Sequence, residues 1–186
     1  MRRHRSWLIA LALLCPSAAA AQISESADER PIAMAFGAGG VVSVIGNGAD
    51  GRVMVSIPIS DTKTIEPFVA AYGGNDALHT KAVYGIQIRQ RIGDAHRSSR
   101  LEPFWTYGAL GAVARLQSST CAGGRCTTST ETRVLPPLMG TVGAGVEYRL
   151  KPRLALRLDY QAGLVLFVPV GVRGAASIVI PLGARH

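Results

Sequence analysis

Hydrophobic and polar residues alternate with a period of two along most of this 186-residue chain. In the segment 153–166, apolar or aromatic residues occupy every second position from Leu154 onward, and the positions between them include Arg157 and Asp159. Successive side chains of a β-strand point to opposite faces, whereas a helix would scatter these charges among the leucines. The pattern therefore predicts a strand with one apolar and one polar face.

The same alternation recurs in further segments separated by Gly, Pro, Asn, Asp and Ser, among them the turn-like residues 46–48 and 73–76. The predicted strands are residues 32–45, 51–60, 64–73, 79–92, 100–117, 132–150, 153–167 and 169–182. Eight strands of about ten or more residues, joined in sequence order, are typical of a closed barrel. We predict an all-β fold: an eight-stranded, antiparallel, up-and-down transmembrane β-barrel.

A short repeat supports this order. Glu66-Pro67-Phe68 opens the third predicted strand and Glu102-Pro103-Phe104 opens the fifth. In up-and-down order, both strands enter the sheet from the same end. A chance match of three residues is the alternative interpretation.

The N-terminal region has the layout of a secretory signal peptide. A basic segment, residues 1–5, precedes an apolar segment, residues 7–14, and Ala18 to Ala21 supply the small residues of a cleavage site. We predict a signal peptide at 1–21, a flexible polar lead-in at 22–31, and a barrel domain at 32–186. The protein is expected to be exported.

Two cysteines follow the predicted signal peptide, Cys121 and Cys126. An exported chain meets an oxidising compartment, and the Gly-Gly pair between them permits a small ring, so we predict a disulfide in the longest loop, between the fifth and sixth strands. A zinc site would require further ligands, and no histidine lies near in the sequence. No metal site is predicted.

Alternation alone does not show which face lies inside the barrel. A soluble barrel places its apolar face inside, and an outer-membrane barrel places it against lipid. Opposite charges at mid-strand, and the small residues beside them, favour a filled polar lumen. The residues predicted to face the lumen are Arg89, Glu147, Arg149, Arg157, Asp159 and Arg173.

Composition narrows the function. The formal net charge is +8, but three positive charges belong to residues 1–5 and the rest are dispersed, so no nucleic-acid surface is expected. A mean hydropathy of +0.22 argues against disorder. Beyond the N-terminal segment no apolar run reaches the length of a membrane-spanning helix.

The common cofactor and hydrolase motifs are absent from the sequence, so we predict no catalytic, cofactor or metal site. His96 and Ser98, with Asp94 to orient the imidazole, have a spacing seen in catalytic pairs. A solvated turn is the preferred interpretation of this segment.

The chain resembles small Gram-negative outer-membrane barrels of the OmpA/OmpX-like kind. The resemblance lies in 142–150, the Lys151-Pro152-Arg153 turn, 154–160, and the Pro-aromatic strand 102–111. It implies an integral, non-enzymatic protein of the cell outer membrane with a structural or surface-interaction role, which contacts lipid, passes through the barrel assembly machinery and is a monomer. The alternatives are a soluble periplasmic lipocalin-like barrel that binds an apolar ligand, or a lipid A-modifying enzyme that uses His96 and Ser98.

Overall fold

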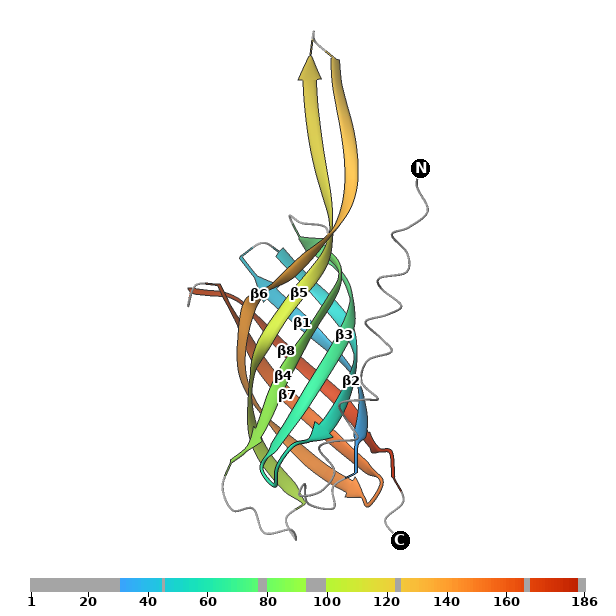
Figure 1. Ribbon diagram of the computed structural model, residues 1–186, viewed down its shortest axis with the longest axis vertical. Helices are drawn as coiled ribbons and strands as arrows, with labels where there is room; N and C mark the ends of the chain where they lie inside the picture. The colour runs from blue at the N-terminus through green and yellow to red at the C-terminus, as the bar shows by residue number, and fades with distance from the viewer. Residues whose placement is uncertain are drawn as a thin grey trace.

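The computed structural model describes residues 31–44, 46–76, 80–92, 100–122, 125–165 and 168–183. These residues form a closed barrel in which each strand is antiparallel to the next and β1 pairs with β8 (Figure 1). The strands are β1 (Ala33–Ser43), β2 (Gly46–Pro58), β3 (Lys63–Asp76), β4 (Thr80–Arg91), β5 (Leu101–Ala122), β6 (Arg125–Lys151), β7 (Leu154–Val165) and β8 (Val168–Pro181). The predicted closed antiparallel barrel is confirmed.

The two ends of the barrel differ. One end, here called the terminal end, holds Pro31, Gly183 and the connections at 59–62 and 152–153. The opposite end, the hairpin end, carries the last residue of β1, the first residue of β2 and a long extension of β5 and β6 (Figure 1).

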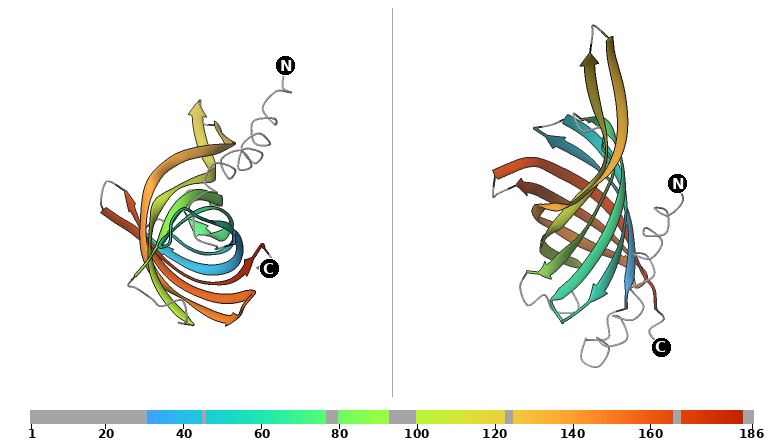
Figure 2. Two further views of the ribbon diagram at one scale, coloured as in Figure 1. Left: turned by 60° about the horizontal axis from the view of Figure 1, so that its bottom comes forward. Right: turned by 45° about the horizontal axis from the view of Figure 1, so that its top comes forward.

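The extension is a two-stranded ribbon rather than the predicted loop. β4 pairs with β5 only as far as Ala114, and β7 pairs with β6 only from Gly140, so residues 115–122 and 125–132 pair with each other alone. Figure 2 shows this ribbon leaving the barrel from two further directions. Its many threonines favour extended backbone, and the facing cysteines join the two strands, which explains why a strand forms here.

The ribbon bends away from the barrel at a bulge in β6. Leu110 pairs with Met139 but Ala112 pairs with Leu135, so β6 contains extra residues that include Pro136 and Pro137. Proline has no N–H to donate to a sheet ladder and is found at bulges for that reason. The hydroxyl of Tyr84 donates to the carbonyl of Leu135 at 2.8 Å, which ties the base of the ribbon to β4.

The glycine-rich segments 46–48 and 73–76, predicted as turns, are strand in the structure. They pair with each other across β2 and β3, with Gly46 opposite Asp76 and Gly48 opposite Gly74. A Cβ on Gly48 would lie 2.4 Å from atoms of the Tyr72 side chain, so glycine here makes room for that ring.

The polar faces of the strands point into the barrel. Side chains buried there include Glu66 at 0% and Arg157 at 1% exposure, together with the aromatic ring of Phe104 at 1%. Large apolar side chains cover the outside instead, in a belt that includes Phe36, Val53, Val69, Ile86, Trp105, Tyr107, Val142, Leu158, Tyr160 and Ile178. The described residues contain no helix long and apolar enough to cross a membrane.

Candidate functional site: the charged lumen and its two mouths

The charged side chains that the structure describes in the lumen fall into three tiers, because every second residue of a strand points inward. The terminal tier contains Arg91, Glu102 and Arg149. The central tier contains Glu66, Arg89, Glu147 and Arg157. The hairpin tier contains Asp50, Arg52, Asp159 and Arg173.

The central tier is a compact cluster of two carboxylates and two guanidinium groups. Nη1 of Arg157 lies 3.1 Å from Oε1 of Glu66, and its Nη2 lies 2.9 Å from Oε2 of Glu147. Arg89 contacts the same two carboxylates, at 2.9 Å and 3.4 Å. A charge removed from water is stable only when it is paired and hydrogen-bonded, and these four side chains neutralise one another.

Uncharged partners complete the shell around Glu66. The hydroxyl of Ser56 donates to its Oε1 at 2.8 Å, and Nε2 of Gln87 donates to its Oε2 at 2.8 Å. Gln87 also accepts a hydrogen bond of 2.9 Å from Nε2 of Gln161, which connects the central tier to the hairpin tier. Hydrogen bonds therefore run from Glu66 through Gln87 and Gln161 to Arg52.

In the hairpin tier Arg173 donates hydrogen bonds to two aspartates. Its Nε and Nη2 donate to the two oxygens of Asp50 at 2.7 and 2.9 Å, a bidentate pair, and its Nη1 donates to Asp159 at 3.2 Å. Bidentate guanidinium–carboxylate pairs are among the strongest hydrogen-bonded contacts in proteins. Asp50 and Arg173 are 123 positions apart in sequence.

Arg52 differs from the other lumen arginines. Its guanidinium stacks over the ring of Phe68 at 4.2 Å and donates to Oε1 of Gln161 at a long 3.4 Å. Its buried Nε, like that of Arg91, has no hydrogen-bond partner, and unlike the other described lumen arginines Arg52 makes no ion pair with a described residue. Arg52 therefore has N–H donors without an acceptor, whereas the neighbouring Arg173 donates to two aspartates.

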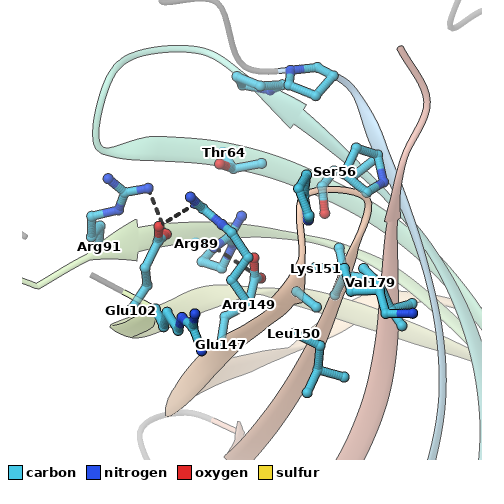
Figure 3. Close-up of a pocket in the computed structure, with 18 residues that line it drawn as sticks. Ser56, Thr64, Arg89, Arg91, Glu102, Glu147, Arg149, Leu150, Lys151 and Val179 are labelled. Carbon is cyan, nitrogen blue, oxygen red and sulfur yellow. Dashed lines mark hydrogen bonds and ion pairs between the residues drawn. The ribbon is translucent and has the colours of Figure 1, made fainter. Parts of the chain in front are cut away.

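At the terminal end Glu102 lies between two arginines (Figure 3). Nη2 of Arg91 and Nη2 of Arg149 lie 2.6 and 2.7 Å from its two oxygens. These side chains line a cavity of about 430 Å³, whose wall also contains Arg100 and Lys151. This mouth of the barrel is rich in positive charge.

The centre of the lumen is closed by side chains. The terminal cavity and a second cavity of about 420 Å³ at the hairpin end share no lining residue. Phe104, Arg157 and Glu66, the largest fully buried side chains among the described residues, line neither cavity and lie between them. Eight strands leave room for side chains rather than for a channel, and this interior agrees with that expectation.

The six lumen residues predicted from the sequence lie in all three tiers rather than in one cluster. Arg89, Glu147 and Arg157 belong to the central tier, Asp159 and Arg173 to the hairpin tier, and Arg149 to the terminal tier. The side chain of Arg149 is 46% exposed at the terminal mouth, whereas that of Arg157 is 1% exposed.

The acidic residues Glu66 and Glu102 were missed as lumen residues, although the sequence carries a signal for both. Each begins a Glu-Pro-Phe repeat, and in each repeat the Glu and the Phe point into the lumen. The ring of Phe68 lies under Arg52, and that of Phe104 lies 5.5 Å from the guanidinium carbons of Arg89 and Arg157. The repeat thus supplies an acid and an aromatic face for arginines at two places.

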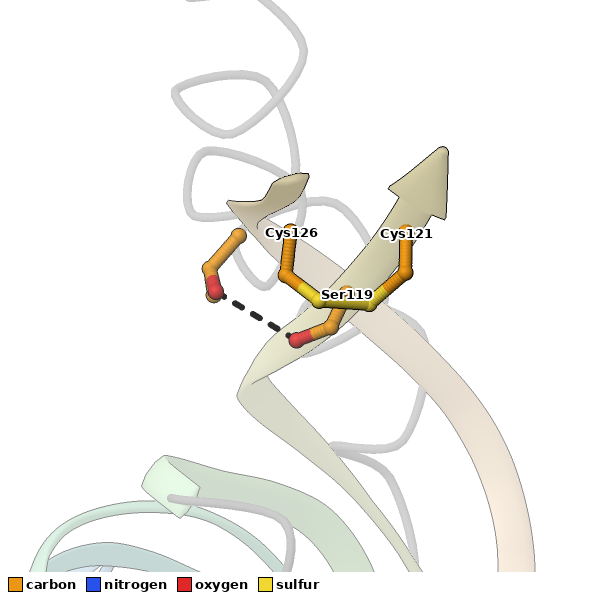
Figure 4. Close-up of a disulfide and its surroundings, with 4 residues drawn as sticks. Ser119, Cys121 and Cys126 are labelled. Atoms are coloured by element: carbon orange, nitrogen blue, oxygen red, sulfur yellow. Dashed lines mark hydrogen bonds between the residues drawn. A yellow bond between two sulfur atoms is a disulfide. The ribbon is translucent and has the colours of Figure 1, made fainter. Parts of the chain in front are cut away.

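The predicted disulfide joins Cys121 and Cys126, which face each other near the far end of the ribbon (Figure 4). Beside it the hydroxyls of Ser119 and Thr128 lie 3.3 Å apart across the two strands. The described residues contain no group of three or more side chains suited to hold a metal ion. The predicted signal peptide at 1–21 and the Asp94, His96 and Ser98 segment lie outside the described residues.

Comparison with solved structures identifies the fold. The N-terminal β-barrel domain of Pseudomonas aeruginosa OprF matches with a TM-score of 0.53 and 11% identity, over 80% of this chain and 96% of that one. Neisserial surface protein A matches with a TM-score of 0.53 and 18% identity, over 81% and 96%. No family model and no curated protein matches the sequence. The chain has the fold of the small eight-stranded outer-membrane barrels, as the resemblance predicted.

Proposed function

We propose that this chain is an integral protein of the cell outer membrane, a closed and non-conducting barrel that displays a surface hairpin and catalyses no reaction. The observation that carries the proposal is the distribution of side chains: charged groups are buried in the lumen while a belt of large apolar residues faces outward. A water-soluble protein rarely exposes so continuous an apolar surface. In a bilayer the same belt contacts lipid.

The dimensions of the barrel support this placement. β7 has 12 residues and β8 has 14, and a tilted strand of about 9–11 residues crosses the hydrocarbon core of a bilayer. Aromatic residues such as Trp105, Tyr107 and Tyr160 lie on the outer face, where amphipathic rings suit a membrane. Lipid is the partner that this surface fits.

The connections support an orientation. Outer-membrane barrels have short periplasmic turns and longer extracellular excursions. The two-residue turn at 152–153 lies at the terminal end, and the ribbon of β5 and β6 lies at the hairpin end. We therefore place the terminal end in the periplasm and the ribbon, with its disulfide, on the cell surface, where it would contact partners.

Passage through the barrel assembly machinery and a monomeric final state are part of the proposal. β1 pairs with β8, so the sheet has no open edge that would need a second copy.

The test is fractionation of cells that express the full chain. We expect the mature protein in the outer-membrane fraction, extracted by detergent and not by salt or carbonate, with a gel mobility that changes on boiling. Release into the osmotic-shock fraction as a soluble protein would overturn the proposal in favour of a periplasmic barrel.

A further inference from the structure

The cavity at the hairpin end is unlike the rest of the lumen, because its walls are mainly aliphatic. It has a volume of about 420 Å³, and its wall includes Val41, Val83, Leu110, Leu135, Met139 and Val170. Binding sites for small molecules are typically concavities of roughly this size, apolar with a few polar groups. An apolar cavity that water does not fill readily takes up an apolar guest.

The polar side chains of this cavity include Gln161 and three members of the hairpin tier, Asp50, Arg52 and Arg173. Arg52 is 4% exposed, and a guanidinium has five N–H donors, of which the described residues engage one, at 3.4 Å from Gln161. A buried donor without an acceptor is costly, so a guest that supplies an oxygen would satisfy Arg52. The site therefore combines an aliphatic wall with a hydrogen-bond donor.

The net charge of the hairpin tier determines whether the oxygen of the guest should be charged or neutral. Asp50 and Asp159 balance Arg52 and Arg173, so the tier is already neutral, and both carboxylates contact Arg173. An anionic head would add an uncompensated negative charge beside two aspartates, which is unfavourable in a buried site. An uncharged carbonyl oxygen accepts a hydrogen bond without that cost.

We propose that the hairpin-end cavity binds a small uncharged amphiphile, whose hydrocarbon chain lies against the aliphatic wall and whose amide, ester or ketone oxygen accepts a hydrogen bond from Arg52. The inference concerns the lumen alone and does not depend on which way the barrel is oriented in a membrane.

Photolabelling of the full-length mature protein in phospholipid vesicles tests the site. The probes are three ten-carbon chains, each with a diazirine in the chain: a dimethylamide, a carboxylate and a plain hydrocarbon. Labelled peptides are mapped by mass spectrometry. Peptides that contain Met139 or Val170 report the cavity, and the peptide that contains Ile86 reports the outer belt as an internal control.

Two glycines provide a matched pair of variants. A Cβ on Gly163 would point at Met139 Sδ, 2.8 Å away, the flexible end of a side chain that lines the cavity, so Gly163→Leu fills the cavity. Gly140 lies on the adjacent strand, opposite Leu164, with its nearest neighbour at 3.7 Å. Gly140→Leu therefore adds the same side chain on the outer face. A third variant, Arg52→Met, removes the donors.

We expect the amide probe to label the cavity peptides in a saturable manner, suppressed by unlabelled N,N-dimethyldecanamide, while labelling of the belt stays unchanged. Gly163→Leu should abolish the saturable part and Gly140→Leu should retain it. Arg52→Met should weaken competition by the amide about three- to tenfold, the value of one net hydrogen bond, and leave the hydrocarbon probe unaffected.

Three results would overturn the inference. Cavity labelling that does not saturate would mean that no site exists. Saturable labelling that persists in Gly163→Leu would place the site elsewhere. Competition by decanoate that equals or exceeds that by the amide would contradict the uncharged head. The comparison of probes and the glycine pair do not depend on whether Arg52→Met folds.

Discussion

Glu66 and Glu102 make equivalent contacts in different tiers of the lumen: each lies near the start of an odd-numbered strand and contacts one arginine of β4 and one from the β6–β7 hairpin. Glu66 contacts Arg89 at 2.9 Å and Arg157 at 3.1 Å, and Glu102 contacts Arg91 at 2.6 Å and Arg149 at 2.7 Å. The two acids differ in exposure to water, because Arg149 reaches the mouth and Arg157 does not.

This difference in exposure predicts that a Glu→Gln substitution lowers the free energy of unfolding more at Glu66 than at Glu102. Glu66→Gln leaves Arg157 and Arg89 to share Glu147, and loss of one partner of a buried pair costs about 3 to 5 kcal/mol. Glu102→Gln should cost less than half as much, because water solvates Arg149. Urea unfolding in vesicles, followed by gel mobility, measures both. Equal midpoints for the two variants would contradict the tiered description.

The outer belt predicts a strong effect of charge at Leu158, whose side chain is 50% exposed on the outer face of β7. Leu158→Lys should lower the free energy of unfolding in vesicles by about 2 to 4 kcal/mol, the cost of a basic side chain in contact with lipid near the bilayer midplane. Leu158→Met, which conserves volume and polarity, should cost less than about 1.5 kcal/mol. If both variants unfold alike, Leu158 does not contact lipid.

The disulfide is expected to hold the ribbon and not the barrel. An isolated two-stranded hairpin is only marginally stable, so the Cys121→Ser, Cys126→Ser double variant should be cleaved faster by trypsin at Arg115, at the base of the ribbon. The heat-dependent gel mobility should remain that of the parent, because the strand pairs of the barrel do not involve the ribbon. In the unreduced, denatured parent, neither cysteine should react with a thiol reagent.

The closed centre predicts the absence of permeation. Vesicles that contain the protein should swell in small sugars no faster than empty vesicles, since Phe104, Arg157 and Glu66 fill the lumen between the two cavities. An eight-stranded barrel has no further room for a water path. Swelling that rises with the amount of protein would show that the central tier opens.

The proposed absence of catalysis has a direct chemical readout. Cells that express the parent chain, a Ser98→Ala variant, or neither should contain the same lipid A species by mass spectrometry. A lipid A change present with the parent and lost with Ser98→Ala would instead identify an enzyme.

Strand alternation was enough to predict the strands of the barrel, because period two is a local property of the chain. The polar interior was predicted from the opposite charges and small residues at mid-strand. The ribbon was not predicted because the Ser- and Thr-rich residues 117–132 lack the apolar residues that would alternate with polar ones. The glycine-rich residues 46–48 were interpreted as a turn because their role, making room for Tyr72, depends on the next strand.

The division of the lumen charges into three tiers could not be predicted from strand alternation. Which acid meets which arginine depends on the stagger between strands, and the contact of Asp50 with Arg173 joins residues 123 positions apart. A sequence shows that Arg157 and Asp159 lie on one face, but not that they belong to different tiers. The Glu-Pro-Phe repeat was the one local signal for the missing acids.

The pairing of β1 with β8 has a consequence for biogenesis. Arg173 on β8 contacts Asp50 on β2 only when these two strands have been brought together around the barrel, so in an open sheet Arg173 would keep Asp159 on the adjacent β7 while Asp50 would lose its arginine. Such a sheet cannot enter hydrocarbon at low cost, because unpaired charges and free strand edges are both penalised there. We therefore expect membrane entry to be coupled to closure of the β1–β8 junction.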